Sequence, residues 1–231
     1  MRPSLRLCFA LLAVAAVAIG CQTGPRLAGL NSFFRPERTS FQTPAQRIEA
    51  IRLVAKKSTR EDTPEQETLV RGLITDLPTE QDPLIRQAIL EATAEFKTTL
   101  ASKALLAGLS DESPHVREAS CRLLTASPVA GSADALATIA HGDPSFDVRV
   151  AAAKALGRNG ATRQQLLPVL EDPNPAMQLA GVEAMRDATG KDFGGDVSAY
   201  RALARGETPS SDGDGGRIEV ANRLPSWVPF F

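Results

Sequence analysis

The sequence predicts an all-α protein, an α-solenoid of about four to five similar helix pairs with disordered termini. One pattern recurs along it: a polar turn with Pro, then a helix that opens with an apolar residue and an anchor residue. The anchors are Arg86, Arg117, Arg149 and Gln178, so the interval is about one helix pair. No alternating β-pattern of useful length competes with this reading.

Each copy of the pattern keeps more than its anchor. An apolar residue stands directly before the anchor and an alanine stands two positions after it. The apolar residues are Ile85, Val116, Val148 and Met177, and the alanines are Ala88, Ala119, Ala151 and Ala180. A repeat defined by position indicates stacked units that share a core, because one helix pair cannot cover its own apolar face.

The chain opens with the features of a signal peptide. Two arginines precede an apolar run over residues 7–19, which is too short for a permanent membrane helix. The run closes in Ala-Ile-Gly-Cys at residues 18–21, which resembles the lipobox of bacterial lipoproteins. That resemblance implies a cleaved signal peptide, residues 1–20, and a lipid attached to Cys21. An ordinary signal peptide or an uncleaved anchor is the alternative.

A tether and two helices are expected next. Residues 21–42 show little periodicity and carry several Gly and Pro, which is typical of a tether between lipid and fold. Thr43-Pro44-Ala45-Gln46 is a capping box with Pro at the first helical position, and Thr63-Pro64 repeats the device. The sequence therefore predicts helices from Pro44 and Pro64, joined as an αα-hairpin.

Later helix starts use the same chemistry, an acceptor side chain followed by Pro. They are Asp82-Pro83, Ser113-Pro114, Asp143-Pro144 and Asn174-Pro175. Partner helices are expected between them, near Leu100 to Leu109, Ala133 to Ala140 and Arg163 to Leu170. A last helix after Asp196 closes the repeat domain, residues 43–206.

The segment 207–231 is expected to be a flexible tail with an aromatic end. Its first half, rich in Ser, Gly and Asp, is typical of disorder. Its second half holds Trp227, Phe230 and Phe231. This end is either unstructured or a short motif that docks on a partner or on the repeats.

The repeats resemble HEAT repeats of the short kind also called PBS-lyase-like. The resemblance covers roughly Pro44 to Ala204 and rests on the turn with Asp and Pro and on the helix that opens with Val-Arg. The segment DATGKDFGGDVSAYRAL also resembles the end of HEAT-repeat lipoproteins from planctomycete-type bacteria. The family implies an α-solenoid in which the second helix of each pair lines the concave side.

The anchor arginines Arg86, Arg117 and Arg149 predict a structural ladder. Each stands near a helix start, where its guanidinium can reach the turn carboxylate of the adjacent repeat. The expected acceptors are Asp111, Asp143 and Asp172. An anion-binding role is the alternative.

Positions one and five residues after each anchor predict a partner-binding face. They repeat at matching places on successive helices and would form one stripe. The candidate residues are Gln87, Glu91, Glu118, Arg122, Lys154 and Glu183, with Val150 and Leu179 at the two remaining positions. Because the charges are mixed, an ordinary solvated face is the alternative.

Neither the composition nor the motifs of the sequence indicate a catalytic, metal or cofactor site. Without residues 1–20 the net charge is about −3, which does not indicate binding to nucleic acid or acidic lipid. His115 and His141 are the only histidines, and Cys121 is expected to be a buried thiol. No P-loop, GxSxG, HExxH or CxxC motif occurs. We therefore expect no catalytic residue, metal, cofactor or small-molecule substrate.

Together these observations predict a scaffold that is not an enzyme. It would be held by lipid at a membrane of the cell envelope, on the periplasmic or extracytoplasmic side, and would bind a protein partner whose identity the sequence does not reveal. The alternative is an enzyme or enzyme subunit related to the PBS-lyase-type proteins, because a fold does not fix a function.

Overall fold

The computed structural model of the 231-residue chain describes residues 42–209. The predicted signal peptide, Cys21, nearly all of the tether and the tail beyond Pro209 lie outside the described residues. Residues 42–209 are all-helical, and no strand occurs among them. The all-α fold class is therefore confirmed for this part of the chain.

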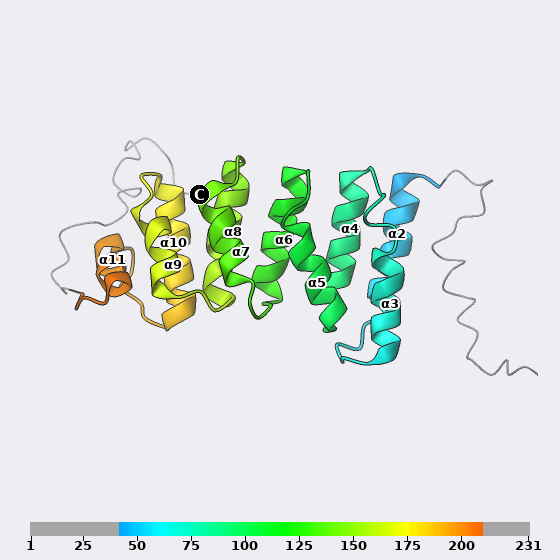
Figure 1. Ribbon diagram of the computed structural model, residues 1–231, viewed down its shortest axis with the longest axis horizontal. Coiled ribbons are helices and arrows are strands. Elements are labelled where there is room, and N and C mark those ends of the chain that lie inside the picture. The colour runs from blue at the N-terminus through cyan, green and yellow to red at the C-terminus, as the bar shows by residue number, and fades with distance from the viewer. Residues whose placement is uncertain (1–41, 210–231) are drawn as a thin grey trace, which may run out of the picture.

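The described residues form ten helices, labelled α2 to α11 in Figure 1. None of these ten has the length and hydrophobicity needed to cross a bilayer. Their bounds are α2 Pro44–Ala55, α3 Pro64–Ile74, α4 Pro83–Ala94, α5 Thr99–Gly108, α6 Pro114–Ala126, α7 Ala133–Gly142, α8 Phe146–Arg158, α9 Arg163–Glu171, α10 Pro175–Thr189 and α11 Val197–Arg205.

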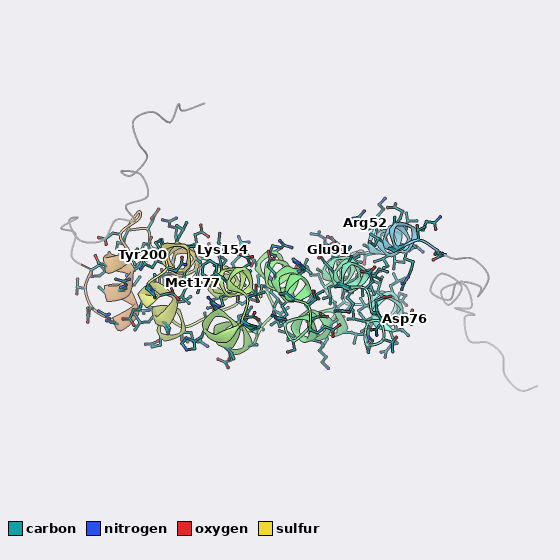
Figure 2. The ribbon with its side chains drawn as sticks, turned by 90° about the horizontal axis from the view of Figure 1, so that it is seen from above. Arg52, Asp76, Glu91, Lys154, Met177 and Tyr200 are labelled. Atoms are coloured by element: carbon teal, nitrogen blue, oxygen red, sulfur yellow. The ribbon has the colours of Figure 1, made fainter. Side chains whose placement is uncertain are left out.

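The helices lie in a row from α2 at one end to α11 at the other (Figure 1). Helices α2, α4, α6, α8 and α10 form one layer, in which each helix packs against the next. Helices α3, α5, α7 and α9 lie on the other side of the row (Figure 2). We call α4, α6, α8 and α10, which carry the anchor residues, the anchor helices, and α2 belongs to their layer. The row then consists of the pairs α3–α4, α5–α6, α7–α8 and α9–α10, with α2 and α11 as single helices at its two ends.

Most helix starts follow the capping chemistry of the sequence, but Ser113 precedes α6 without a capping hydrogen bond to its side chain. Thr43 and Gln46 form the predicted capping box at α2, and Asp82 accepts a hydrogen bond from the Leu84 N–H at 2.9 Å. The expected N-cap at Asp143 is wrong, because Ser145 precedes α8 and Asp143 ends α7. Asp143 instead accepts from the Ser145 N–H at 2.8 Å, which orders the turn between the two helices.

Two apolar clusters make up the core. One joins α2, α3 and α4 to the start of α5, and the other runs from α4 to α11. Helix α4 contributes to both through adjacent residues, Ile89 to the first cluster and Leu90 to the second. The core is thus continuous along the row of helices.

Small residues allow the anchor helices to approach closely. Gly157 of α8 faces the backbone of α10, where an added Cβ would lie 2.3 Å from the Ala184 carbonyl oxygen. No side chain other than hydrogen fits in that space. This contact fixes the distance between α8 and α10, the two helices that carry Lys154 and Glu183.

Candidate interaction surface

The anchor position has one geometry in four successive repeats. It is the fourth residue of α4, α6, α8 and α10, and its side chain donates to the carbonyl oxygen six residues earlier. The bonds are Arg86 to Glu80 at 3.0 Å, Arg117 to Asp111 at 2.8 Å, Arg149 to Asp143 at 2.8 Å and Gln178 to Asp172 at 2.8 Å. Gln178 makes the same contact although it carries no charge. The shared role of the anchor residue is therefore to stabilise the turn before its own helix.

Two anchors also reach the next repeat. The guanidinium of Arg86 makes two hydrogen bonds to the Asp111 carboxylate, at 2.9 and 2.8 Å, and Arg117 binds Asp143 in the same way, at 2.7 and 2.9 Å. Such paired, charge-assisted bonds are stronger and more directional than single ones. The hydrogen bonds that Arg117 donates hold the pKa of Asp143 below its usual value, and the hydrogen bonds that Arg86 donates to Asp111 raise the pKa of Arg86.

The third expected pair, Arg149 with Asp172, does not form. Arg149 pairs with no carboxylate among residues 42–209 and instead lies 5.3 Å from the centre of the Phe146 ring. Asp172 accepts from the Asn174 N–H at 2.7 Å. Phe146 holds the first position of α8, where α4, α6 and α10 have Pro, and its ring supplies the alternative contact for Arg149.

The sequence pattern missed a fifth position of the same kind. Arg47 is the fourth residue of α2, and its guanidinium binds the Glu80 carboxylate in the turn before α4. Glu80 in turn accepts from the Asp82 N–H at 2.9 Å, as the turn aspartates do in later repeats. The ladder therefore begins at Arg47 and links α2, α4, α6 and the turn before α8. Counting four residues from each N-cap, rather than matching the Val-Arg motif, would have found it.

The predicted stripe residues lie on α4, α6, α8 and α10, within one layer. Figure 2 shows Glu91 and Lys154 along the same side of the row, with Arg52 of α2 beyond them and Asp76 on the opposite side. Glu91, Arg122 and Lys154 are exposed, whereas Gln87, Glu118 and Glu183 are half-buried. The structure thus brings the six residues onto one accessible face.

The polar groups of this stripe are paired with one another. Within helices, the Gln87 amide donates to Glu91 at 2.7 Å and Arg122 binds Glu118 at 2.9 Å. Between helices, Lys154 of α8 binds Glu183 of α10 at 3.1 Å. Arg158 and Asp187 add a second link between α8 and α10 at 3.5 Å. These contacts hold the side chains in defined places on the surface.

Apolar groups occupy the same face at its α8–α10 end. Val150 is half-buried and Leu179 is 45% exposed, one residue after each anchor. The corresponding positions on α4 and α6 are Gln87 and Glu118. The stripe therefore passes from polar on α4 and α6 to partly apolar on α8 and α10.

Groups with catalytic potential lie in ordinary structural surroundings. Cys121 is fully buried, and burial raises the pKa of its thiol to about 12, which suppresses the reactive thiolate. His115 and His141 are exposed, near the start of α6 and the end of α7. No group of three or more His, Cys, Asp and Glu in the part of the chain that the structure describes could hold a metal ion.

The acidic loop at residues 190–196 serves to connect α10 and α11. Asp192 accepts from the Gly194 N–H at 2.8 Å and binds Arg186 at 2.9 Å. Asp196 caps α11, and the buried hydroxyl of Tyr200 accepts from the Phe193 N–H at 2.9 Å. These carboxylates and the tyrosine order the loop.

A depression of about 450 Å³ lies on another part of the row, between the start of α9, the end of α10 and α11. It is lined by Thr162, Arg163, Gln164, Thr189, Lys191 and Leu203, among others. It shares no residue with the stripe.

No protein-family model matches this chain, and no curated protein shows significant similarity to it. The fold and the geometry of its own residues are therefore the basis on which a function is proposed.

Proposed function

We propose that the chain is an α-solenoid of HEAT-like helix pairs that acts as a protein-binding scaffold, attached by lipid on Cys21 to a membrane of the cell envelope. One observation carries the binding role: matching positions of α4, α6, α8 and α10 bring Gln87, Glu91, Glu118, Arg122, Lys154 and Glu183 onto one face. Contacts made along such a face add together, because the helices that present it are packed in register.

Support for the solenoid comes from the repetition of contacts. Each anchor helix packs on the next one, and the four anchors from Arg86 to Gln178 make the same bond to the carbonyl six residues earlier. A bundle around one closed core would not need the same turn contact at each step. A row built from repeated units does.

The chemistry of the stripe fits a protein partner. Its three glutamates and two basic residues nearly cancel, and Leu179 adds apolar area beside them. A nucleic-acid surface would require an excess of Lys and Arg to neutralise phosphates. Mixed polar groups next to apolar area are typical of protein interfaces.

A charge exchange tests this role directly. In the double variant Glu118→Arg with Arg122→Glu, the two residues can still pair, so the melting temperature should change little. Capture of a partner from detergent-solubilised native membranes, followed by mass spectrometry, should fall about tenfold or more. The matched control is Glu67→Arg with Arg71→Glu, because these residues form the same kind of pair on α3 in the other layer.

Equal capture by both double variants and by the unchanged protein would contradict the proposed face. Capture that survives both exchanges but is lost on deletion of residues 217–231 would assign binding to the aromatic tail instead. The membrane attachment has its own test. Cys21→Ser should move the protein out of the membrane pellet, and an unmodified Cys21 in the intact mass would contradict the lipid.

A further inference from the structure

The overall charge of about −3 conceals a strong asymmetry along the chain. Residues 21–60 contain eight Lys and Arg against two Glu, a net charge of about +6. Residues 61–231 contain 16 Lys and Arg against 25 Asp and Glu, a net charge of about −9. The positive charge is therefore concentrated in the segment that ends with α2 and the turn after it.

Part of this positive charge lies on the exposed side of α2. Arg52, Leu53, Lys56 and Lys57 are all exposed, and we name these four residues the α2 basic surface. Residues 49, 52, 53 and 56 share one side of the helix by their spacing, while Ile51 and Val54 point into the core. Glu49 is the acidic group on this side, so the side keeps a net positive charge.

Two cations of this surface, Arg52 and Lys56, differ from most other basic residues of the fold. Arg47, Arg86, Arg117 and Lys154 form ion pairs, whereas Arg52 and Lys56 form none within residues 42–209. Between these two cations, Leu53 leaves 43% of its surface exposed. A large apolar side chain flanked by long cationic ones suits an interface where headgroups meet hydrocarbon.

Within residues 42–209, no other helix covers this side of α2. Helix α2 is the first of its layer and packs against α4 and α3 (Figure 1). In Figure 2, Arg52 lies at the α2 end of the row, on the side that also carries Glu91 and Lys154. The surface therefore lies at the end of the molecule nearest to Cys21 in sequence.

We propose that the α2 basic surface binds membranes rich in anionic phospholipid. Lys and Arg close to such a membrane are attracted by its negative surface potential, and Leu53 can enter the headgroup region. The attraction acts only within about a Debye length of the membrane, so it holds the α2 end of the row toward the membrane. The inference rests on the proposed membrane attachment and deepens it, because the lipid on Cys21 would anchor the chain and the basic surface supplies a second, electrostatic contact.

The test uses the chain from Gln22 to Phe231, which has no acylated cysteine. Every contact described above lies within residues 42–209, so the fold keeps its contacts without residues 1–21. Co-sedimentation is measured with vesicles of phosphatidylglycerol and phosphatidylcholine, and with vesicles of phosphatidylcholine alone. We expect binding to the anionic vesicles at low salt, loss of binding as salt is added, and little binding to the neutral vesicles.

Two triple variants distinguish the effect of charge on the α2 basic surface from the effect of the net charge of the protein. Arg52→Gln, Lys56→Gln and Lys57→Gln should lower the partition coefficient about 100-fold, since each cation near an anionic surface contributes about fivefold. The control changes Lys103, Arg163 and Lys191 to Gln, which removes the same charge from exposed positions on α5, on α9 and after α10. The control should change binding less than about threefold, and circular dichroism checks that both variants remain folded.

The proposal is overturned if the unchanged protein does not bind anionic vesicles at low salt. It is also overturned if the control loses as much binding as the α2 variant, or if neutral vesicles bind equally well. None of these results depends on acylation, because the protein tested lacks Cys21. A failure here is therefore distinguishable from an unmodified cysteine, which would contradict the lipid anchor itself.

Discussion

The guanidinium of Arg117 binds both carboxylate oxygens of Asp143, at 2.7 and 2.9 Å, and thereby joins α6 to the turn before α8. The side chains are only 13% and 5% exposed. Removing one partner of a buried pair leaves the other charge without compensation, which typically costs about 3–5 kcal/mol. The pair thus makes the packing of neighbouring repeats depend on one arginine.

Arg117→Met should therefore lower the free energy of unfolding by about 3 kcal/mol, measured by urea denaturation. Arg149→Met is the matched comparison, because Arg149 makes one carbonyl bond and a ring contact but no ion pair within the described residues. We expect this second change to cost about 1–2 kcal/mol. If both variants lost the same free energy of unfolding, the ion pair between Arg117 and Asp143 would not contribute to stability.

Because of Asp143, the free energy of unfolding should also depend on pH in the acid range. Its pKa is lowered by the bond from Arg117 and then by the Ser145 N–H, so the folded state binds the proton less readily than the unfolded state does. The stabilisation is present above the ordinary pKa of about 3.9 and is lost as pH falls through the folded value. The stability gap between the unchanged protein and Asp143→Asn should therefore narrow from pH 5 to pH 2. A gap that stays constant would contradict this linkage.

The helix starts could be predicted because their signals are local. Thr43-Pro44 and Asp82-Pro83 specify helix starts through one side chain and one fixed φ angle, and both appear where the sequence predicts them. Contacts between repeats were harder to predict. Arg47 precedes Arg86 by a longer interval than the other anchors show, so the repeat period hides its equivalence.

The errors have physical causes as well. An aspartate before Pro at Asp143 resembles an N-cap, but its carboxylate is engaged by the Arg117 guanidinium and the Ser145 N–H. Asn159 was not identified, although its buried amide donates to the Leu124 carbonyl at 3.0 Å and accepts from Ser132 at 2.7 Å. No local motif marks it, because these two partners lie 35 and 27 residues away in the sequence.

Gly157 tests the close approach of α8 and α10. In Gly157→Ala the new Cβ would lie 2.3 Å from the Ala184 carbonyl oxygen, so the helices must separate. We expect a loss of about 2 kcal/mol or more, read from the melting temperature. Gly142→Ala at the end of α7 is the control, since nothing lies within 4 Å of its added Cβ. An unchanged melting temperature for Gly157→Ala would mean that the two helices do not meet there.

A substitution at Thr93 should stabilise the protein, in contrast to the changes above. The Thr93 hydroxyl is fully buried in α4 and has no hydrogen-bond partner among residues 42–209, which costs free energy in the folded state. Thr93→Val keeps the shape and should raise the free energy of unfolding by about 1 kcal/mol. Thr138→Val on the exposed side of α7 should stay within about 0.5 kcal/mol, because its hydroxyl already donates to Asp134 at 2.9 Å. If Thr93→Val instead lowered the free energy of unfolding, the prediction would be wrong and the hydroxyl would have a hydrogen-bond partner.

The scaffold role is tested most directly by placing a photo-crosslinking amino acid at Glu118 and, in a second protein, at Glu67. Both positions form a pair with an arginine four residues on, but they lie in opposite layers, on α6 and α3. After irradiation of native membranes, position 118 should yield a discrete crosslinked protein that position 67 does not yield. The same product from position 67, or no product from position 118 in cells where the partner is captured, would contradict the account.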